Sequence, residues 1–327
     1  MSDPIRGTYR KEKAFFVIIF IQVVSYLATP QYNLIKDANS DMPLLSVPLS
    51  VPLVAIVSCI KSSGSRPAKG IEENLLPSVY RTLTKEELAT YRVELILGYD
   101  DDDAYWQHEH NHQLNVTNAT VPVNFVSIRK DLRDRPSRIP FNELCRAAFE
   151  HGATYIVRIN DDSEFITPGW ITAAIQTLES YSPPNVGVVG PTCKEGNTNI
   201  LTHDFVHAPS HYSIFDTYYP SVFDNWFIDD WISRVYGKNR TEKLPGWVVK
   251  HNIHMFGTRY KPGKSQSALL GDLLEEGNRN VETYCGTFDR VRAQGEKQHL
   301  QMLGTDRVES VDGHMQDLQM YLPQPQF

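Results

Sequence analysis

Residues 142–165 read NELCRAAFEHGATYIVRINDDSEF, and the pattern in this stretch decides which fold is predicted. Four apolar side chains recur at helical spacing and predict one buried helix face: Leu144, Cys145, Ala148 and Phe149. Gly152 follows at the position where a glycine commonly ends a helix. Residues 155–159 then predict a strand that runs directly into the polar segment 160–164.

Short apolar runs on either side predict the other strands of the same sheet, at residues 53–58, 93–97, 123–128 and 186–189. The run 53–58 is continuous, which is typical of a strand buried on both faces. Thr84 and Glu87 form a capping box that opens a short helix, and residues 170–178 carry an amphipathic stripe. This alternation predicts an α/β fold, Rossmann-like, with a mostly parallel sheet flanked by helices.

Acidic residues follow two of the predicted strands. Residues 100–103 come after the second strand, and Asp161 and Asp162 come after the fourth. Ligands of such sheets bind beyond the carboxyl ends of the strands. Neither G-x-G-x-x-G nor a P-loop motif is present, so another group must neutralise a phosphate. Adjacent carboxylates are suited to Mn²⁺ or Mg²⁺, which would bridge a nucleotide diphosphate. The alternative is a solvated turn that caps the helix near Trp170.

The region from residue 52 to residue 262 resembles the GT-A glycosyltransferases. Four segments carry the resemblance: VAIVSCIKS (54–62), ELILGYDDDD (94–103), NELCRAAFEHGATYIVRINDDSEF (142–165) and FDNWFIDDWISRVYG (223–237). The resemblance implies a GT-A fold and a sugar nucleotide as donor. It also implies that residues 160–162 correspond to the family's DxD metal motif, with Asn160 in the first position.

The resemblance further implies the ligands of the metal, Mn²⁺ or Mg²⁺. Asp162 keeps the main metal position, with Asp161 beside it. The family usually adds one late ligand, often a histidine, after the acceptor segment. His251 and His254 are the two candidates, and His251 is preferred because His254 precedes two apolar residues and could belong to the core.

In the resembling family, the base and ribose of the donor are held at the ends of the first two strands. That implies a donor-binding group in this sequence made of Ser58, Cys59, Asp100, Asp102, Asp103 and Asp161. The acids in residues 100–103 could equally be solvated loop residues or a calcium site.

Asp229 and Asp230 form a second acidic pair, in the first turn of a helix predicted to end at Gly237. Acids at this place complement the helix dipole, which is the purely structural explanation. The resembling family places an acidic pair at such a helix start, facing the acceptor hydroxyl. An inverting enzyme needs one carboxylate base for that hydroxyl, and we predict Asp230 as the base with Asp229 orienting it. A retaining enzyme would need no such base, and the stereochemistry stays open.

The N-terminal segment resembles a membrane anchor. Residues 14–28 are almost entirely apolar and follow a basic flank, the pattern of a type II signal anchor. A cleaved signal peptide and a buried helix are the alternatives. The anchor, together with three N-glycosylation sequons at Asn115, Asn118 and Asn239, predicts a catalytic domain in the Golgi or ER lumen. The predicted organisation is a tail (1–13), an anchor (14–29), a stem (30–50), a catalytic domain (51–270) and a C-terminal extension (271–327).

Composition excludes several classes of protein. The chain has 327 residues, 41% hydrophobic and 22% charged, as ordinary globular proteins do, and a net charge of -7. The acidic balance argues against a nucleic-acid partner. The four cysteines are too scattered for a disulfide scaffold or a C-x-x-C zinc site. The histidine-rich run 203–211 has zinc-like spacing, although contacts with the acceptor or loop packing suit it better. The arginines of residues 129–138 are expected in a solvated loop.

The sequence therefore predicts a metal-dependent glycosyltransferase that moves a hexosyl or related sugar from a nucleotide-diphosphate donor to a glycan or glycoprotein acceptor. Two alternatives remain. A nucleotidyltransferase also uses paired acids and metal ions on an α/β sheet. A membrane-tethered module that binds carbohydrate or calcium could keep the fold without catalysis.

Overall fold

The computed structural model describes residues 51–63, 65–116, 119–253, 260 and 266–302. The predicted tail, anchor and stem, the sequon asparagine Asn118, and the candidate ligand His254 lie outside these residues. Among the helices that are described, none combines the length and the apolar character that a membrane span requires. Residues 49–289 form one compact unit, to which the sheet and the candidate site belong.

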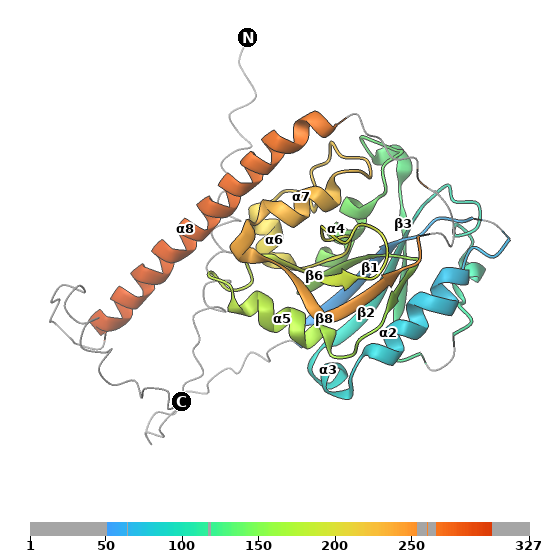
Figure 1. Ribbon diagram of the computed structural model, residues 1–327, viewed down its shortest axis with the longest axis horizontal. Helices are drawn as coiled ribbons and strands as arrows, with labels where there is room; N and C mark the ends of the chain where they lie inside the picture. Colours follow the sequence, from blue (N-terminus) through green and yellow to red (C-terminus); the bar gives the residue numbers. More distant parts are fainter. Residues whose placement is uncertain (1–50, 64, 117–118, 254–259, 261–265, 303–327) are drawn as a thin grey trace, which may run out of the picture. The chain divides into compact units, whose positions relative to one another are not determined.

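The described strands form one mixed sheet of eight strands in the order β3-β2-β1-β4-β7-β6-β8-β5 (Figure 1). Their bounds are β1 Leu53–Cys59, β2 Arg92–Asp100, β3 Val123–Ile128, β4 Tyr155–Asn160, β5 Ser163–Phe165, β6 Val188–Cys193, β7 Asp204–His207 and β8 Thr241–His251. The strands β3, β2, β1 and β4 are parallel neighbours, as predicted. Beyond β4 the sheet is mixed, because β7 runs antiparallel to both β4 and β6, and β5 runs antiparallel to β8.

Helices cover both faces of the sheet in the compact unit (Figure 1). The α-helices are α2 Leu76–Thr82, α3 Lys85–Thr90, α4 Phe141–Glu150, α5 Trp170–Ser180, α6 Ala208–Ile214, α7 Ile228–Val235 and α8 Leu270–Met302. The short helical segments are the π-helix η1 Ile71–Leu75 and the 3₁₀-helices η2 Glu109–His112, η3 Lys130–Leu132, η4 Lys238–Arg240 and η5 Ser267–Leu269. Side chains of η1, α2 and α5 pack on one face, and side chains of α4, α6, α7 and the first part of α8 pack on the other.

Strand β1 explains how one apolar run supports both layers. Successive side chains of a strand point to opposite faces of the sheet. Val54 and Ile56 accordingly join the core beneath η1, α2 and α5, whereas Ala55 and Val57 join the core beneath α4 and α7. All four are fully buried, with 0% exposure. The continuous hydrophobicity of this run is therefore needed on both sides, as the sequence predicted.

The predicted helix signals are confirmed where they can be compared. The Thr84 hydroxyl accepts a hydrogen bond from the Glu87 amide at 3.1 Å, and the Glu87 carboxylate accepts one from the Thr84 amide at 3.0 Å. This reciprocal capping box opens α3. Gly152 follows the end of α4 with a φ of +97°, a left-handed conformation that favours glycine.

Replacing Thr84 with alanine should destabilise the protein by about 1 kcal/mol, because the Glu87 amide loses its acceptor at the start of α3. Urea unfolding of both proteins measures this change. Thr90→Ala, at the exposed end of the same helix, is the matched control and should change stability by less than about 0.5 kcal/mol. Equal effects of the two substitutions would contradict the capping role.

Candidate active site

The carboxyl ends of three parallel strands meet at one edge of the sheet. Cys59, the last residue of β1, pairs with Gly98 of β2 on one side and with Asn160 of β4 on the other. The segments that follow β2 and β4 therefore leave the sheet on either side of β1. The predicted metal motif and the predicted donor-binding acids lie at this shared edge, where parallel sheets bind ligands.

Strand β8 brings His251 to the end of the metal motif. His251 is the last residue of β8, and it pairs with Ser163, the first residue of β5. Asp162, which immediately precedes Ser163, therefore lies beside the imidazole. The distance from His251 Nε2 to Asp162 Oδ1 is 3.1 Å, and Nε2 lies 3.0 Å from Asn160 Nδ2. The structure thus brings His251 against Asn160, which lies 91 positions earlier in the sequence, and against Asp162.

Asp162 and His251 have polar atoms suited to a metal ion. Both side chains are largely buried, and neither Asp162 Oδ1 nor His251 Nδ1 makes a hydrogen bond within the described residues. The contact between His251 Nε2 and Asp162 Oδ1 is close but lacks hydrogen-bond geometry. Two ligand atoms that are adjacent on an octahedral ion, each about 2.1 Å from it, lie about 3 Å apart. The 3.1 Å separation of Nε2 and Oδ1 fits such a pair of ligands, provided that Nε2 exchanges its contact with Asn160 Nδ2 for the ion.

The protein itself supplies an incomplete coordination shell here. Within the described residues, no group of three or more His, Cys, Asp or Glu side chains is arranged to hold a metal ion. Mg²⁺ and similar hard cations are commonly bound through one or two carboxylates, and waters and substrate phosphates complete the shell. Asp162 and His251 could therefore hold such an ion only together with waters or a ligand that supplies further oxygens.

The other members of the predicted donor site are buried near the same edge. Asp161 is 3% exposed, and Ser58 and Cys59 are 0% and 6% exposed. Burial raises the pKa of the Cys59 thiol well above its usual range, with the Asp100 and Asp161 carboxylates among the groups that raise it further. Cys59 is therefore held as a neutral thiol. The Ser58 hydroxyl oxygen makes no hydrogen bond within the described residues.

The acids of residues 100–103 are each engaged by other parts of the protein. Arg133 donates to Asp100 at 2.6 Å in a buried ion pair, and Lys130 pairs with Asp102 at the surface at 2.7 Å. Burial raises the pKa of Asp100, and Arg133 opposes that rise. Asp103 accepts hydrogen bonds from three backbone amides, those of Ser62, Tyr105 and Trp106. These contacts order the loops after β1 and β2, and a role in donor binding stays a prediction.

The prediction of a solvated basic loop at residues 129–138 was wrong for three of its arginines. Arg133 and Arg138 are 7% and 5% exposed. Arg138 pairs with Glu143 at 2.5 Å, and Arg135 makes two hydrogen bonds to Asp224. The acidic partners are distant in sequence, except for Glu143, so local composition did not indicate them. This segment ties the loop before α4 to the loop before α7.

The two acids at the start of α7 have different surroundings. Asp230 pairs with Arg234, one turn along the helix, at 2.6 Å. Asp229 instead accepts a hydrogen bond from Arg158 of β4, also at 2.6 Å. Burial raises the pKa of Asp229, while the charge of Arg158 and its hydrogen bond oppose the rise. Of the pair, Asp229 is therefore the carboxylate that is bonded to the buried interior of the sheet, through Arg158.

Sequence reasoning missed Arg158 and the role of Asp204. Arg158 is 1% exposed and Asp204 is 0% exposed, and their side chains meet at 2.8 Å. The available signal was an arginine inside an apolar strand, since a buried cation requires an anionic partner. Asp204 lies on β7, a four-residue strand that was not predicted because its sequence, DFVH, is polar at both ends.

The histidines of residues 203–211 serve separate purposes, and the described residues hold no zinc cluster among them. His203 contacts the Ser163 hydroxyl at 2.7 Å, and burial lowers its pKa well below the usual range. The His207 side chain caps α6 by accepting from the Ser210 amide. His211 contacts the Tyr236 hydroxyl at 2.7 Å, and burial lowers its pKa to about 3. All three pack inside the fold, as the packing alternative predicted.

Sequence comparison gives no relatives for this chain: no family model matches it, and no curated protein does. Several solved structures are similar to it at low identity. A crystal structure of S. aureus TarS is 13% identical with a TM-score of 0.40, and the match covers 61% of this chain but only 36% of that one.

Two further structures contain ligands. S. aureus TarS in complex with UDP is 12% identical with a TM-score of 0.43, over 72% of this chain and 70% of that chain. GalNAc-T7 with UDP, GalNAc and Mn²⁺ is 11% identical with a TM-score of 0.43, over 62% and 44%. Likenesses at this level establish neither a family nor a function.

Proposed function

We propose that this protein is a metal-dependent glycosyltransferase that moves a sugar from a nucleotide-diphosphate donor to a saccharide-bearing acceptor. One observation carries the proposal. The buried carboxylate of Asp162 and the imidazole of His251 lie 3.1 Å apart at the carboxyl edge of the sheet. This edge lacks a glycine-rich phosphate loop, so a metal ion between these side chains and a diphosphate is the arrangement that best accounts for the pair.

Asp162 and His251 would hold the ion, with Asp161 beside them. A bound Mn²⁺ or Mg²⁺ would offset the negative charge that develops on the departing diphosphate. Ser58, Cys59 and the acids of residues 100–103 would line the end that receives the nucleotide. Since Asp100, Asp102 and Asp103 already have protein partners, their part is to hold those loops in shape.

Transfer with inversion requires a base on the acceptor side. The acceptor hydroxyl oxygen bonds to the anomeric carbon, the bond from that carbon to the diphosphate oxygen breaks, and the hydroxyl proton passes to a carboxylate. The sequence-based choice of Asp230 stays a prediction. The contacts favour exchanging the two roles, because Asp229 is bonded to the buried Arg158 of β4 whereas Asp230 pairs with Arg234 of its own helix.

We also propose that residues 14–29 anchor the chain as a type II membrane protein, with the catalytic domain in the Golgi or ER lumen. The basic flank before the apolar run and the sequons support this orientation. Of the sequon asparagines, Asn239 lies in the turn η4 on the surface, where an oligosaccharide can be accommodated.

A thermal-shift screen of sugar nucleotides with and without Mn²⁺ tests the proposal. A ligand that binds the folded protein raises its melting temperature, so the true donor should raise it only when Mn²⁺ is present. In the presence of Mn²⁺, the protein should also hydrolyse this donor slowly to the nucleoside diphosphate. If no sugar nucleotide in the panel raises the melting temperature, the result would contradict the proposed function. Binding without hydrolysis would favour the non-catalytic module, and release of pyrophosphate from a nucleoside triphosphate would favour a nucleotidyltransferase.

A further inference from the structure

Arg158 is the most heavily bonded buried cation in the described part of the chain. Its Nη1 donates to the backbone oxygen of Thr202 at 2.7 Å, and its Nε donates to Asp204 at 3.0 Å and to the Tyr219 hydroxyl at 2.7 Å. Its Nη2 donates to Asp229 Oδ1 at 2.6 Å. The guanidinium is planar and carries its donors in a fixed fork, so these acceptors together allow one orientation.

Asp204, which contacts Nε and Nη2 of the guanidinium, is itself held by two tyrosine hydroxyls. The Tyr218 hydroxyl donates to Asp204 Oδ1 at 2.7 Å, and the Tyr219 hydroxyl donates to Oδ2 at 2.6 Å. Asp204 is fully buried and belongs to β7, next to the strand of Arg158. A buried carboxylate with two hydroxyl donors and one cation is fully satisfied, so it serves as a rigid support.

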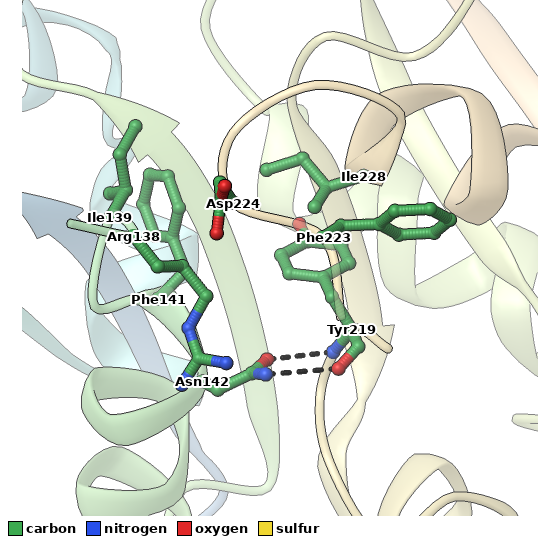
Figure 2. Close-up of a pocket in the computed structure, with 8 residues that line it drawn as sticks. All are labelled: Arg138, Ile139, Phe141, Asn142, Tyr219, Phe223, Asp224 and Ile228. Carbon is green, nitrogen blue, oxygen red and sulfur yellow. Dashed lines mark hydrogen bonds between the residues drawn. The ribbon is translucent and has the colours of Figure 1, made fainter. Parts of the chain in front are cut away.

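The tyrosine that bridges this network is itself fixed by its backbone. The Asn142 side chain donates to the Tyr219 carbonyl at 2.9 Å and accepts from the Tyr219 amide at 2.8 Å. Figure 2 shows these two bonds at the side of a small pocket that Phe141 and Tyr219 also line. The Arg158 guanidinium lies 5.3 Å from the centre of the Phe141 ring. Helix α4 thus restrains both Tyr219 and Arg158.

Asp229 differs from Arg158, Asp204 and Tyr219, because its side chain is partly open to solvent. Its side chain is 32% exposed, whereas the side chains of Arg158 and Asp204 are 2% and 0% exposed. The bond from Arg158 engages one carboxylate oxygen, Oδ1. The network therefore ends in a carboxylate of fixed orientation at the solvent boundary, in the first turn of α7.

We propose that Arg158 is a positioning residue, which fixes Asp229 for proton transfer from the acceptor and is fixed in turn by Asp204 and Tyr219. The inference rests on the proposed function, and it adds a reason for the buried charge. A buried ion pair is weak evidence for stability by itself, since apolar replacements are often equally stable. The groups that act on the Asp229 carboxylate are Arg158 on β4, Asp204 on β7 and the imidazole of His251 on β8. Among the described residues, Arg158 donates a hydrogen bond to this carboxylate, whereas the Ser233 hydroxyl bonds to the backbone oxygen of Asp229.

A double-mutant cycle with Arg158→Met and Asp229→Asn tests the inference. Arg158→Met should lower kcat by about 100-fold, the cost of a misplaced reacting group, with an unchanged donor-induced shift in melting temperature. In the Asp229→Asn background the same substitution should have no further effect on kcat, because both act through one carboxylate. Independent, multiplying losses would overturn the inference.

Two further measurements keep the inference testable if Arg158→Met folds poorly. Arg158→Lys keeps the charge and should restore part of kcat, and Tyr219→Phe removes only one hydroxyl and should move kcat in the same direction without unfolding the protein. The acid limb of the pH profile should move to higher pH in Arg158→Met, since the cation that favours the ionised Asp229 is gone. Arg81→Met, which breaks a surface pair with Glu164, is the matched control and should leave kcat unchanged.

The failure of the inference differs from the failure of the proposed function. If the wild-type protein turns over no sugar nucleotide, the proposed function fails. Thermal unfolding of the wild type, Arg158→Met, Asp229→Asn and the double variant then tests whether Arg158 holds Asp229. Direct contact between the two residues predicts that the changes in melting temperature are not additive. Additive melting temperatures would show that Arg158 does not hold Asp229, whatever reaction the site performs.

Discussion

Replacing Asp162 with asparagine should abolish Mn²⁺-dependent binding of the sugar nucleotide and lower donor hydrolysis by at least about 100-fold. Among the described residues, the Asp162 carboxylate is the anionic group in contact with His251, and an amide is a poor ligand for a hard divalent ion. The substitution preserves shape, and the backbone oxygen of Asp162 keeps its hydrogen bonds from Asn252. We therefore expect the fold to survive. Isothermal titration with Mn²⁺ and donor, alongside thermal unfolding, measures both effects.

The matched control for this prediction is Glu164→Gln, two residues further along the same segment. Glu164 pairs with Arg81 at 3.1 Å, away from the metal motif, and a surface pair of this kind contributes at most about 1 kcal/mol. The Glu164→Gln variant should therefore bind the donor with the affinity of the wild type. His251→Ala should weaken binding in the same direction as Asp162→Asn. Tight, Mn²⁺-dependent donor binding by the Asp162→Asn variant would show that Asp162 does not hold the metal ion.

The parallel half of the sheet could be predicted because each of its elements is specified locally. The run 53–58 is apolar on both faces, the capping box marks the start of α3, and Gly152 marks the end of α4. These signals lie within a few residues of the structure they determine. The same holds for Asp161 and Asp162, which follow a buried strand, so their place at the sheet edge followed from chain order.

The rest of the site depends on pairings between distant segments, which short-range patterns do not encode. The three-residue strand β5 and the polar strand β7 have no recognisable periodicity, yet β5 aligns Asp162 with His251 and β7 supplies Asp204. The choice between Asp229 and Asp230 likewise depends on Arg158, which lies 71 residues before Asp229. Their helical spacing alone shows only that neighbouring side chains point in different directions.

The two acids at the start of α7 should therefore respond differently to neutralisation. Asp229→Asn should lower kcat by 10² to 10⁴-fold, the range attributed to a positioned general base, while the donor-induced shift in melting temperature is kept. Asp230→Asn should change kcat by no more than a few fold, because it breaks only a surface pair with Arg234. Steady-state transfer assays on both variants, with donor binding measured in parallel, make the comparison.

The pH dependence provides an independent check on the same assignment. A base must be ionised to accept the proton, so the transfer rate falls as the pH drops through its pKa in the folded enzyme. Burial raises the pKa of Asp229 above its ordinary value of 3.8, and the acid limb should lie correspondingly higher than for an exposed aspartate. The limb should vanish in Asp229→Asn and persist in Asp230→Asn. The reverse pattern would identify Asp230 as the general base. An unchanged transfer rate in both variants would favour a retaining reaction, which needs no such carboxylate.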